Sequence, residues 1–278
     1  MNSVETADGR LGAVLSAPRG GMVQLGRHGP WLATTPALVR RVLTDPTSFD
    51  FPSDVSRSGD LSGSKGETRS GHVLFSPLTP EQVAIGGSVF EEEWRTEVAH
   101  HERTSGGAPY DAMVLLRRPV ARSTTAAVLP ELSTARRDAI GDLTLDWIDT
   151  LGPVIAAKRP PSRWSRLRRN EQRARHALED ELADGSEPQQ AGRAATMLAA
   201  GIQVPIAAGA FLLGWLGQHP TVGAATDPVN AVWETLRLTP PTWITARITT
   251  REVDLDGTAI PAGRVVFVSP LLLGRSSA

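Results

Sequence analysis

The sequence predicts a mainly α-helical protein with a small β region, and three observations carry that prediction. Several long stretches place apolar residues at spacings of three and four, the period of an amphipathic helix. The stretch from Met197 to Trp215 contains no charged residue and is long enough for a central helix. Short segments of alternating apolar and polar residues lie near both ends of the chain, around 22–33 and 253–268.

Length and composition describe an ordinary globular chain. Its 278 residues can bury a full hydrophobic core, and 21% charged residues is typical of soluble proteins. A formal net charge of -1 gives no global reason to expect nucleic acid or an anionic membrane as a partner. The absence of cysteine excludes disulfides, thiolate zinc sites and Cys nucleophiles, and it fits a reducing compartment, so we expect a cytoplasmic protein.

The N-terminal stretch, residues 1–19, is polar and lacks an apolar core, so it resembles neither a signal peptide nor a membrane anchor. We expect a flexible leader over 1–19 and a single domain over 20–278. The domain should begin with a hairpin of 22–25 and 31–33. A helix should follow from Thr35-Pro36, with Leu38, Val39, Val42 and Leu43 on its buried face.

Residues 50–71 are rich in Ser, Gly and Asp, so they predict either a loop over a binding site or a plain linker. A helix is predicted over 80–101, started by Thr79. Two further helices should lie within 109–157, with a boundary near 129–133. The second of these should bury the apolar positions Ile140, Leu143, Trp147 and Leu151.

Two charged segments allow a functional and a structural interpretation. The carboxylates of Asp138, Asp142, Asp146 and Asp149 could hold magnesium with a diphosphate, but no partner motif accompanies them, which favours a solvated helix face. The basic stretch 158–175 could dock an acidic partner or nucleic acid. Because acids follow directly, we favour a solvated helix with internal charge pairing.

The uncharged run from Met197 to Trp215 could span a bilayer by length alone. Gly and Pro interrupt it, and no cluster of bases flanks it to set a topology. We therefore expect a central core helix, buried on all sides, and no membrane association.

The last quarter of the chain carries the most specific pattern. Glu234 and Arg237 lie three apart on one helix face, and Pro240-Pro241 ends that helix. Two short strand pairs should follow, turning at Asp256-Gly257 and at 261–263.

This ordered set resembles the K-helix and following β region of the cytochrome P450 superfamily: Glu234-Thr-Leu-Arg237-Leu, Pro240-Pro241, Arg247, Leu255-Asp-Gly and Ile260-Pro-Ala-Gly. The early pattern over 36–49 is similar to that family's helix B. Gln218-His219-Pro220 matches the signature after its long I-helix. The resemblance implies a cytochrome P450-like fold, mainly helical with a small sheet.

For the family, the resemblance implies haem-dependent insertion of one oxygen atom into a small lipophilic, secondary-metabolite type substrate, with electrons from a ferredoxin or reductase. It makes Glu234 and Arg237 a structural ion pair that staples the fold, and it makes Arg247 a contact to a haem propionate. The family's next landmark is the loop with the Cys thiolate that binds iron. The sequence has no cysteine and ends before that loop, so we expect a truncated domain without the haem loop and L-helix.

The I-helix groove of the family should lie at Ala200, Gly201, Gln203 and Val204. Family members carry an acid and a Thr there to relay protons, whereas Gln203 and Val204 cannot do so. Pro205 should still kink the helix by leaving one carbonyl without a backbone donor. The stretch 80–101 offers no basic residues that match those of helix C for the second propionate, and none of the histidines occupies the family's ligand position. The sequence therefore assigns no catalytic residue and no metal ligand.

Two accounts remain open. In the first, the chain is the larger part of a monooxygenase and is inactive by itself, with an apolar face that a protein partner could cover. In the second, it is a haem-free auxiliary or binding subunit for a partner biosynthetic enzyme. A variant of the second uses the emptied pocket for cofactor-free catalysis.

Overall fold

The computed structural model describes residues 7–50, 78–157, 161–183, 188–221 and 226–275. The chain divides into two compact units, one formed by Met1–Gly71 with Pro228–Ala278 and the other by His72–Asp227. Each unit is described by itself, so the single domain expected over 20–278 stays a prediction. The segment expected as a loop over 50–71 lies, after Asp50, outside the described residues, as does His72.

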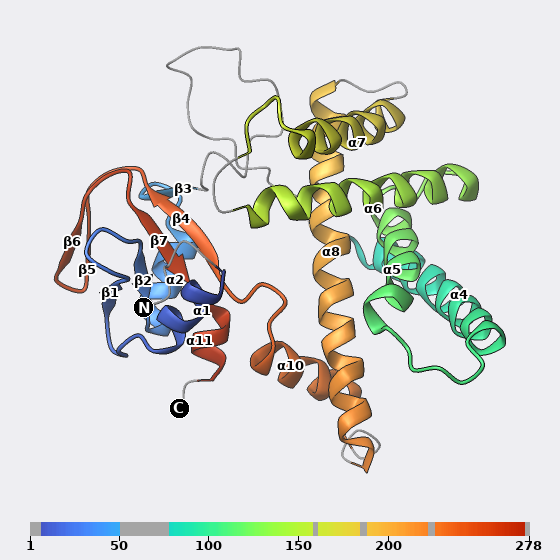
Figure 1. The fold of residues 1–278 in the computed structure, drawn as a ribbon, viewed down its shortest axis with the longest axis horizontal. Helices are drawn as coiled ribbons and strands as arrows, with labels where there is room; N and C mark the ends of the chain where they lie inside the picture. Colours follow the sequence, from blue (N-terminus) through green and yellow to red (C-terminus); the bar gives the residue numbers. More distant parts are fainter. Residues whose placement is uncertain (1–6, 51–77, 158–160, 184–187, 222–225, 276–278) are drawn as a thin grey trace. The chain divides into compact units, whose positions relative to one another are not determined.

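The first unit, called the sheet unit, is built on a five-stranded sheet of order β1-β2-β7-β4-β3 (Figure 1). Strands β2 and β7 pair in parallel, and the other neighbours are antiparallel. A separate hairpin is formed by β5 and β6. The elements are α1 (Ala7–Leu15), β1 (Met22–Gln24), β2 (Trp31–Ala33), α2 (Pro36–Thr44), β3 (Phe49–Asp50), α10 (Pro228–Leu238), β4 (Thr245–Thr249), β5 (Val253–Leu255), β6 (Thr258–Ile260), β7 (Val265–Val268) and α11 (Pro270–Gly274).

Local sequence signals set the first elements of the sheet unit. The predicted β1–β2 hairpin is confirmed. Thr35 caps α2 by accepting a hydrogen bond from the Leu38 amide, and Pro36 opens the helix. Leu38, Val39 and Val42 are buried as expected, but the prediction is wrong for Leu43, which is 42% exposed. Leu43 follows Val42 by one position, so it points about 100° away from that residue around the helix.

The predicted β-region near the C-terminus is confirmed in part. Asp256 and Gly257 both adopt positive φ, at 57° and 78°, and close the β5–β6 hairpin. The second predicted strand pair differs in the structure. Strand β7 does not pair with the β5–β6 hairpin but lies between β2 and β4 in the main sheet. The turn at Gly263, with φ 76°, redirects the chain so that Val266 and Val268 become buried.

The flexible leader expected over 1–19 needs a correction. Residues 7–15 form helix α1, and Val14 is fully buried in a cluster with Leu25, Leu32 and Leu272. The Arg19 guanidinium donates a hydrogen bond of 2.9 Å to the Leu272 carbonyl. Val14 thus packs in a cluster whose residues come from both ends of the chain. The composition of residues 1–19 alone does not reveal such a contact.

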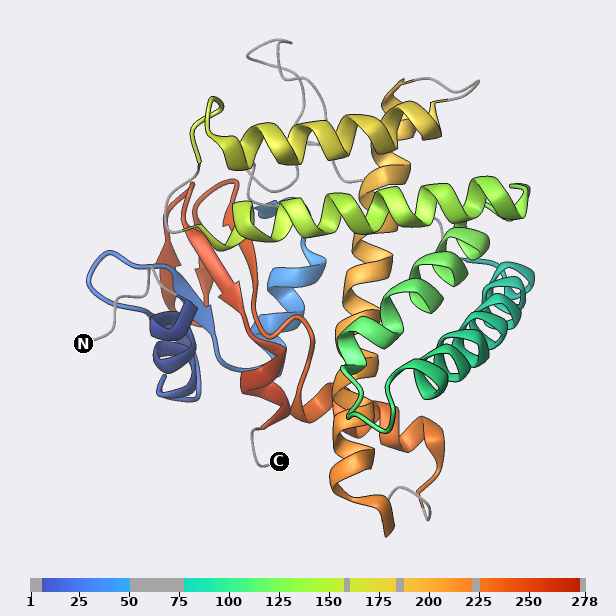
Figure 2. The same ribbon diagram turned by 45° about the vertical axis from the view of Figure 1, so that its right-hand side comes forward.

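The second unit, called the helical unit, consists of five described helices packed around α5 and α8 (Figure 2). Helix α5 contacts α4, α6 and α8, and α7 contacts α6 and α8. These helices are α4 (Pro80–Thr104), α5 (Ala112–Val128), α6 (Thr134–Ala156), α7 (Arg166–Leu182) and α8 (Pro188–Gln218). Their existence and order confirm the sequence prediction.

Side-chain caps explain where these helices begin. Thr79 and Gln82 form a complete capping box on α4. Asp111, Ser133 and Ser165 accept backbone hydrogen bonds at the starts of α5, α6 and α7. The apolar core of the unit includes Leu116, Ile140, Trp147, Leu178, Leu198 and Ile202; Leu143 and Leu151 are partly buried against it.

A cluster of charges joins α4, α5 and α6. Arg122, only 9% exposed, donates two hydrogen bonds to Glu93 at 2.9 and 3.0 Å and lies 3.2 Å from Asp138. Arg118 and Arg137 also approach Glu93, at 3.6 and 3.7 Å. A charge buried to this extent is tolerated only with such partners, so the cluster fixes how the three helices meet.

The other carboxylates of α6 behave as predicted. Asp142, Asp146 and Asp149 are exposed, and Asp149 accepts a hydrogen bond of 2.7 Å from Arg117. Asp138 departs from the expected solvated face because it belongs to the buried charge cluster. Among the described residues, no group of three or more potential metal ligands comes together.

The central helix differs in burial from the prediction. The span Gln190–Gln218 is long enough to cross a membrane, and an 18-residue window within it has a mean hydropathy of 1.8. Core helices of soluble proteins have the same length and composition. The prediction that this helix is buried on all sides is wrong. Only 22% of the most apolar 18-residue window is buried, and Val204 and Phe211 are 40% and 42% exposed. Leu198, Ile202 and Ile206 form the buried side, at spacings of four.

Candidate functional site

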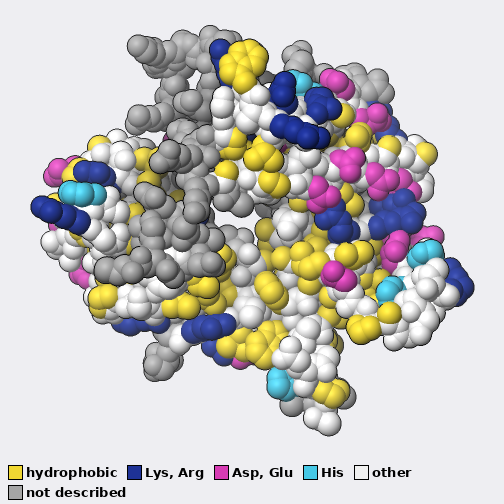
Figure 3. Space-filling view, in the orientation of Figure 1, with side chains coloured by type: hydrophobic (Ala, Val, Ile, Leu, Met, Phe, Trp, Pro, Cys, Tyr) yellow, Lys and Arg dark blue, Asp and Glu magenta, His cyan; other side chains and the backbone are white. Residues whose placement is uncertain are grey.

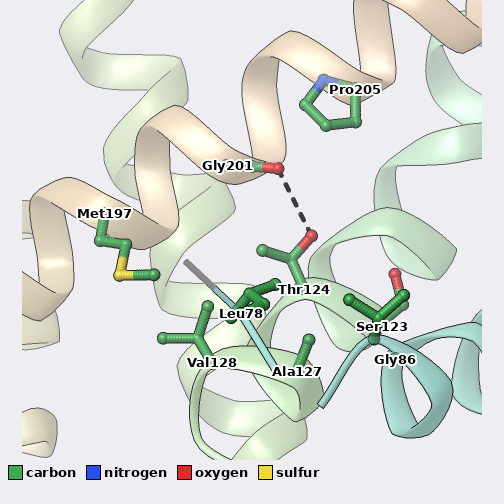
Figure 4. Close-up of a pocket in the computed structure, with 10 residues that line it drawn as sticks. Leu78, Gly86, Ser123, Thr124, Ala127, Val128, Met197, Gly201 and Pro205 are labelled. Carbon is green, nitrogen blue, oxygen red and sulfur yellow. Dashed lines mark hydrogen bonds between the residues drawn. The ribbon is translucent and has the colours of Figure 1, made fainter. Parts of the chain in front are cut away.

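Helix α8 has an irregular site at Gly201 and Pro205, which we call the α8 notch. Pro205 lies inside the helix and has no N–H for the carbonyl of Gly201, four residues before it. That carbonyl instead accepts a long hydrogen bond of 3.4 Å from the Thr124 hydroxyl of α5 (Figure 4). The structure thus supports the prediction that Pro205 frees a carbonyl, and it shows which side chain binds there.

The close contact at the notch requires a small residue at 201. A Cβ added to Gly201 would lie 3.2 Å from the Thr124 methyl group, so a larger side chain would push the two helices apart. The α8 notch borders a groove of about 340 Å³. The groove lies between the first turns of α4, the end of α5 and the middle of α8. The lining residues are Leu78, Val83, Gly86, Ser123, Thr124, Ala127, Val128, Met197, Gly201 and Pro205.

The chemistry of this groove suits binding more than proton transfer. Its lining residues are mostly apolar, and none of them carries a titratable side chain. The two hydroxyls are already engaged, since Ser123 donates to the Val120 carbonyl at 3.1 Å and Thr124 to Gly201. The groove can therefore hold an apolar group, and it offers no acid or base from its lining.

The four positions predicted for the I-helix groove separate in the structure. Gly201 lines the groove, whereas Ala200 and Val204 are exposed and Gln203 is partly exposed. On a helix these positions spread around the axis, so the structure brings only Gly201 to the notch. Sequence reasoning missed Thr124, although the run of small residues 123–127 in a predicted helix is typical of a close helix contact.

Arg247 lies on β4 of the sheet unit, opposite Val266 of β7. Its guanidinium donates a hydrogen bond of 2.9 Å to the neighbouring Ala246 carbonyl. Burial lowers the pKa of Arg247 from its ordinary value, and the carboxylate of Asp50 partly opposes this change. The groove at Gly201 belongs to the helical unit and Arg247 to the sheet unit, and a propionate contact of Arg247 stays a prediction.

Glu234 and Arg237 form the predicted ion pair, through two hydrogen bonds of 2.6 and 2.7 Å. This hydrogen bonding lowers the pKa of Glu234 and raises that of Arg237. Their side chains are 56% and 47% exposed, so solvent screens the pair and its own contribution to stability is small. The role of this pair as a staple of the fold stays a prediction.

Arg237 has a second role at the end of α10. Its guanidinium also donates to the Gly274 carbonyl at the end of α11, while Arg275 donates to the Leu238 carbonyl at 3.0 Å. Each arginine thus satisfies a carbonyl at the C-terminal end of the other helix, where no intrahelical donor remains. This exchange joins α10 to α11, whereas the ion pair lies within α10.

The described residues do not fit a thiolate-ligated haem. The sequence contains no cysteine, so it supplies no thiolate. Among the described histidines, the His101 ring lies tilted against Tyr110 with ring centroids 4.2 Å apart, and His219 stacks on Trp215 at 5.8 Å. Without a thiolate, these residues give no basis for a reaction step through a haem.

Comparisons with known proteins place these observations in a family context. No family model matches the chain. In sequence, the chain is 25% identical over 307 residues to the cyclooctat-9-en-7-ol 5-monooxygenase of Streptomyces melanosporofaciens, covering 89% of this chain and 67% of the relative. The chain thus spans about two thirds of the length of this curated relative.

Solved structures that resemble the chain include cytochromes P450. CYP175A1 from Thermus thermophilus superposes with a TM-score of 0.70 at 21% identity, covering 98% of this chain and 74% of its own. P450 EryK from S. erythraea gives a TM-score of 0.65 at 20% identity, covering 92% and 71%. P450BioI, solved with an acyl carrier protein, gives 0.64 at 17% identity, covering 90% and 72%.

The mainly helical architecture with a small sheet, the K-helix pattern and these matches agree. They confirm the resemblance predicted from the sequence: the chain has the cytochrome P450 fold and resembles the cytochrome P450 superfamily.

Proposed function

We propose that this chain provides the substrate-binding part of a P450-type monooxygenase system and does not carry out oxygenation by itself. The family activity is haem-dependent insertion of one oxygen atom into a small lipophilic substrate, with electrons from a ferredoxin or reductase. The observation that carries the proposal is chemical: none of the 278 residues is a cysteine. A thiolate is the group that favours O–O cleavage in this family, and these residues do not supply it.

The altered central helix supports the same proposal. Gln203 and Val204 stand where family members carry an acid and a Thr, and neither can transfer a proton at neutral pH. The hydroxyl that reaches the α8 notch comes from Thr124 of α5 and is engaged with the Gly201 carbonyl. A proton relay of the family type is therefore lacking at these positions, independently of the missing thiolate.

The substrate class follows from relatives and from the groove together. The curated relative is named for a small lipophilic alcohol, and P450 EryK has been solved with erythromycin B, so we expect a secondary-metabolite type ligand. The apolar groove at Gly201 is of a size that suits part of such a ligand. A haem-free binding subunit for a biosynthetic enzyme is the second candidate, because its function would need the groove and no proton relay.

An absorption experiment tests the proposal. The chain is expressed with a haem precursor, purified, reduced and exposed to carbon monoxide. We expect no thiolate-type Soret band and no product from a small lipophilic alcohol with ferredoxin and reductase. A thiolate-type band would overturn the proposal. Binding of a fluorescent lipophilic probe, measured with the wild type and a Gly201→Leu variant that fills the groove, separates a haem-free binding protein from one without ligand affinity.

A further inference from the structure

Helix α7 carries a row of arginines on its solvent side. Arg166, Arg169 and Arg173 lie three and four positions apart, so they share one face of the helix, and all three are exposed. Figure 3 shows Lys and Arg side chains gathered over the place of α7, with acidic side chains beside them. We call these three residues the arginine row.

Internal charge pairing, expected from the sequence, accounts for other arginines of α7. Glu171, which is 4% exposed, accepts a hydrogen bond from Arg168 at 3.3 Å and one from the indole of Trp147 at 3.0 Å. Glu179 accepts from Arg175 at 2.7 Å. Within the described residues, no carboxylate lies within ion-pair distance of the arginine row, and Arg173 contacts only the neutral amide of Asn170. The prediction of internal pairing is thus confirmed for part of the helix.

The position of the arginine row is unfavourable for the isolated chain. Arg166 and Arg169 occupy the first turns of α7, where the positive end of the helix dipole favours acids and disfavours bases. Just before the helix, the Trp164 ring is 71% exposed, and the Arg163 guanidinium lies 4.7 Å from its centroid. An exposed Trp beside unneutralised arginines is the composition of an interaction surface.

We propose that the arginine row and Trp164 dock an acidic helix on the surface of a partner protein. The row spans about 10 Å, seven residues at about 1.5 Å each, which matches two turns of a facing helix. Beyond it, α7 becomes acidic at 179–181. A continuous polyanion or an anionic membrane would meet those acids as well, whereas a compact acidic patch would not. The proposal is independent of haem binding and of any oxygenase activity.

The probe is a fluorescent alanine-based helical peptide with Glu at spacings of three and four, and binding to the full chain is followed by anisotropy. Neutralising the row should weaken binding about tenfold or more, because each exposed charge contact contributes up to about 1 kcal/mol. Wild-type affinity should fall as salt rises, and this dependence should flatten in the variant. The test variant is Arg166→Gln/Arg169→Gln/Arg173→Gln, and the control of equal charge change is Arg27→Gln/Arg40→Gln/Arg41→Gln, built from exposed residues of the sheet unit.

The control variant should bind the peptide as the wild type does, and Trp164→Ser should weaken binding without changing the salt dependence. Circular dichroism confirms that every variant remains helical. Equal weakening in the test and control variants would overturn the proposal, since it would reduce the effect to net charge. Absence of peptide binding to the wild type would do the same. Tighter binding to phosphatidylglycerol vesicles or to duplex DNA than to the peptide would also overturn it.

Discussion

We attribute the hydrogen bond from Thr124 to the Gly201 carbonyl to Pro205, which leaves that carbonyl without its helical donor. Replacing Thr124 by Val keeps the shape of the side chain and removes the hydroxyl. The bond is long, 3.4 Å, and Gly201 is only partly buried, so we expect a loss at the lower end of the usual range, about 0.5–1 kcal/mol. In a Pro205→Ala background, the new N–H can bind the same carbonyl, and the loss should shrink toward zero.

Four proteins measure this coupling: the wild type, the two single variants and the double variant. Urea denaturation followed by far-UV circular dichroism gives the free energy of unfolding of each. Pro205→Ala should itself stabilise, because Pro inside a helix is disfavoured by up to about 3 kcal/mol relative to Ala. Ser123→Ala is the matched control, since this neighbouring hydroxyl donates to Val120 within α5 and should be indifferent to residue 205. An equal cost of Thr124→Val in both backgrounds would refute the reasoning.

Three further predictions follow from the described contacts. Gly87→Ala should stabilise α4 by about 0.5–1 kcal/mol, because its Cβ meets open space. Gly86→Ala should lack this gain or destabilise, because its Cβ would lie 3.0 Å from the Ala127 Cβ and 3.1 Å from a backbone oxygen. The urea midpoints of the two variants test this, and a higher midpoint for Gly86→Ala than for Gly87→Ala would contradict it. Arg122→Met should cost about 2–4 kcal/mol by leaving Glu93 buried without its closest partner, and a variant within about 0.5 kcal/mol of the wild type in the same urea titration would contradict the role of the charge cluster. Hydrogen bonds from Thr47 and Ser48 lower the pKa of Asp45 from 3.8 to about 2, so its stabilising effect should be complete above about pH 4 and fade as the pH falls toward 2; NMR titration of the carboxyl carbon checks this, and an ordinary value would contradict it.

Much of the secondary structure was predictable because its signals are local. Thr35-Pro36, the Thr79 capping box and Ser133 mark helix starts through hydrogen bonds to residues two or three positions away. The Asp256-Gly257 turn requires positive φ, which Gly supplies readily. Helix α1 was missed because its single deep contact, through Val14, is made with residues distant in sequence.

The candidate site was predictable only in part. Pro205 pointed to a free carbonyl, and that inference needs nothing beyond helix geometry. The partner, Thr124, belongs to another helix, and its identity depends on how α5 and α8 cross. Glu234 and Arg237 show the same division: their spacing predicted the ion pair, but spacing does not determine exposure, and the two side chains are 56% and 47% exposed.

By itself, the sequence determined the mainly helical class, the family resemblance, the absence of a cysteine thiolate and the identity of Gln203 and Val204 on the central helix, because these depend on residue identity and short-range spacing. Only the tertiary structure decided that β7 pairs with β2 as well as β4, that Thr124 occupies the α8 notch, and that the arginine row of α7 has no described carboxylate partner. The physical reason is the same in each case. Contacts between segments far apart in the chain depend on packing in three dimensions, which local propensity and periodicity do not encode.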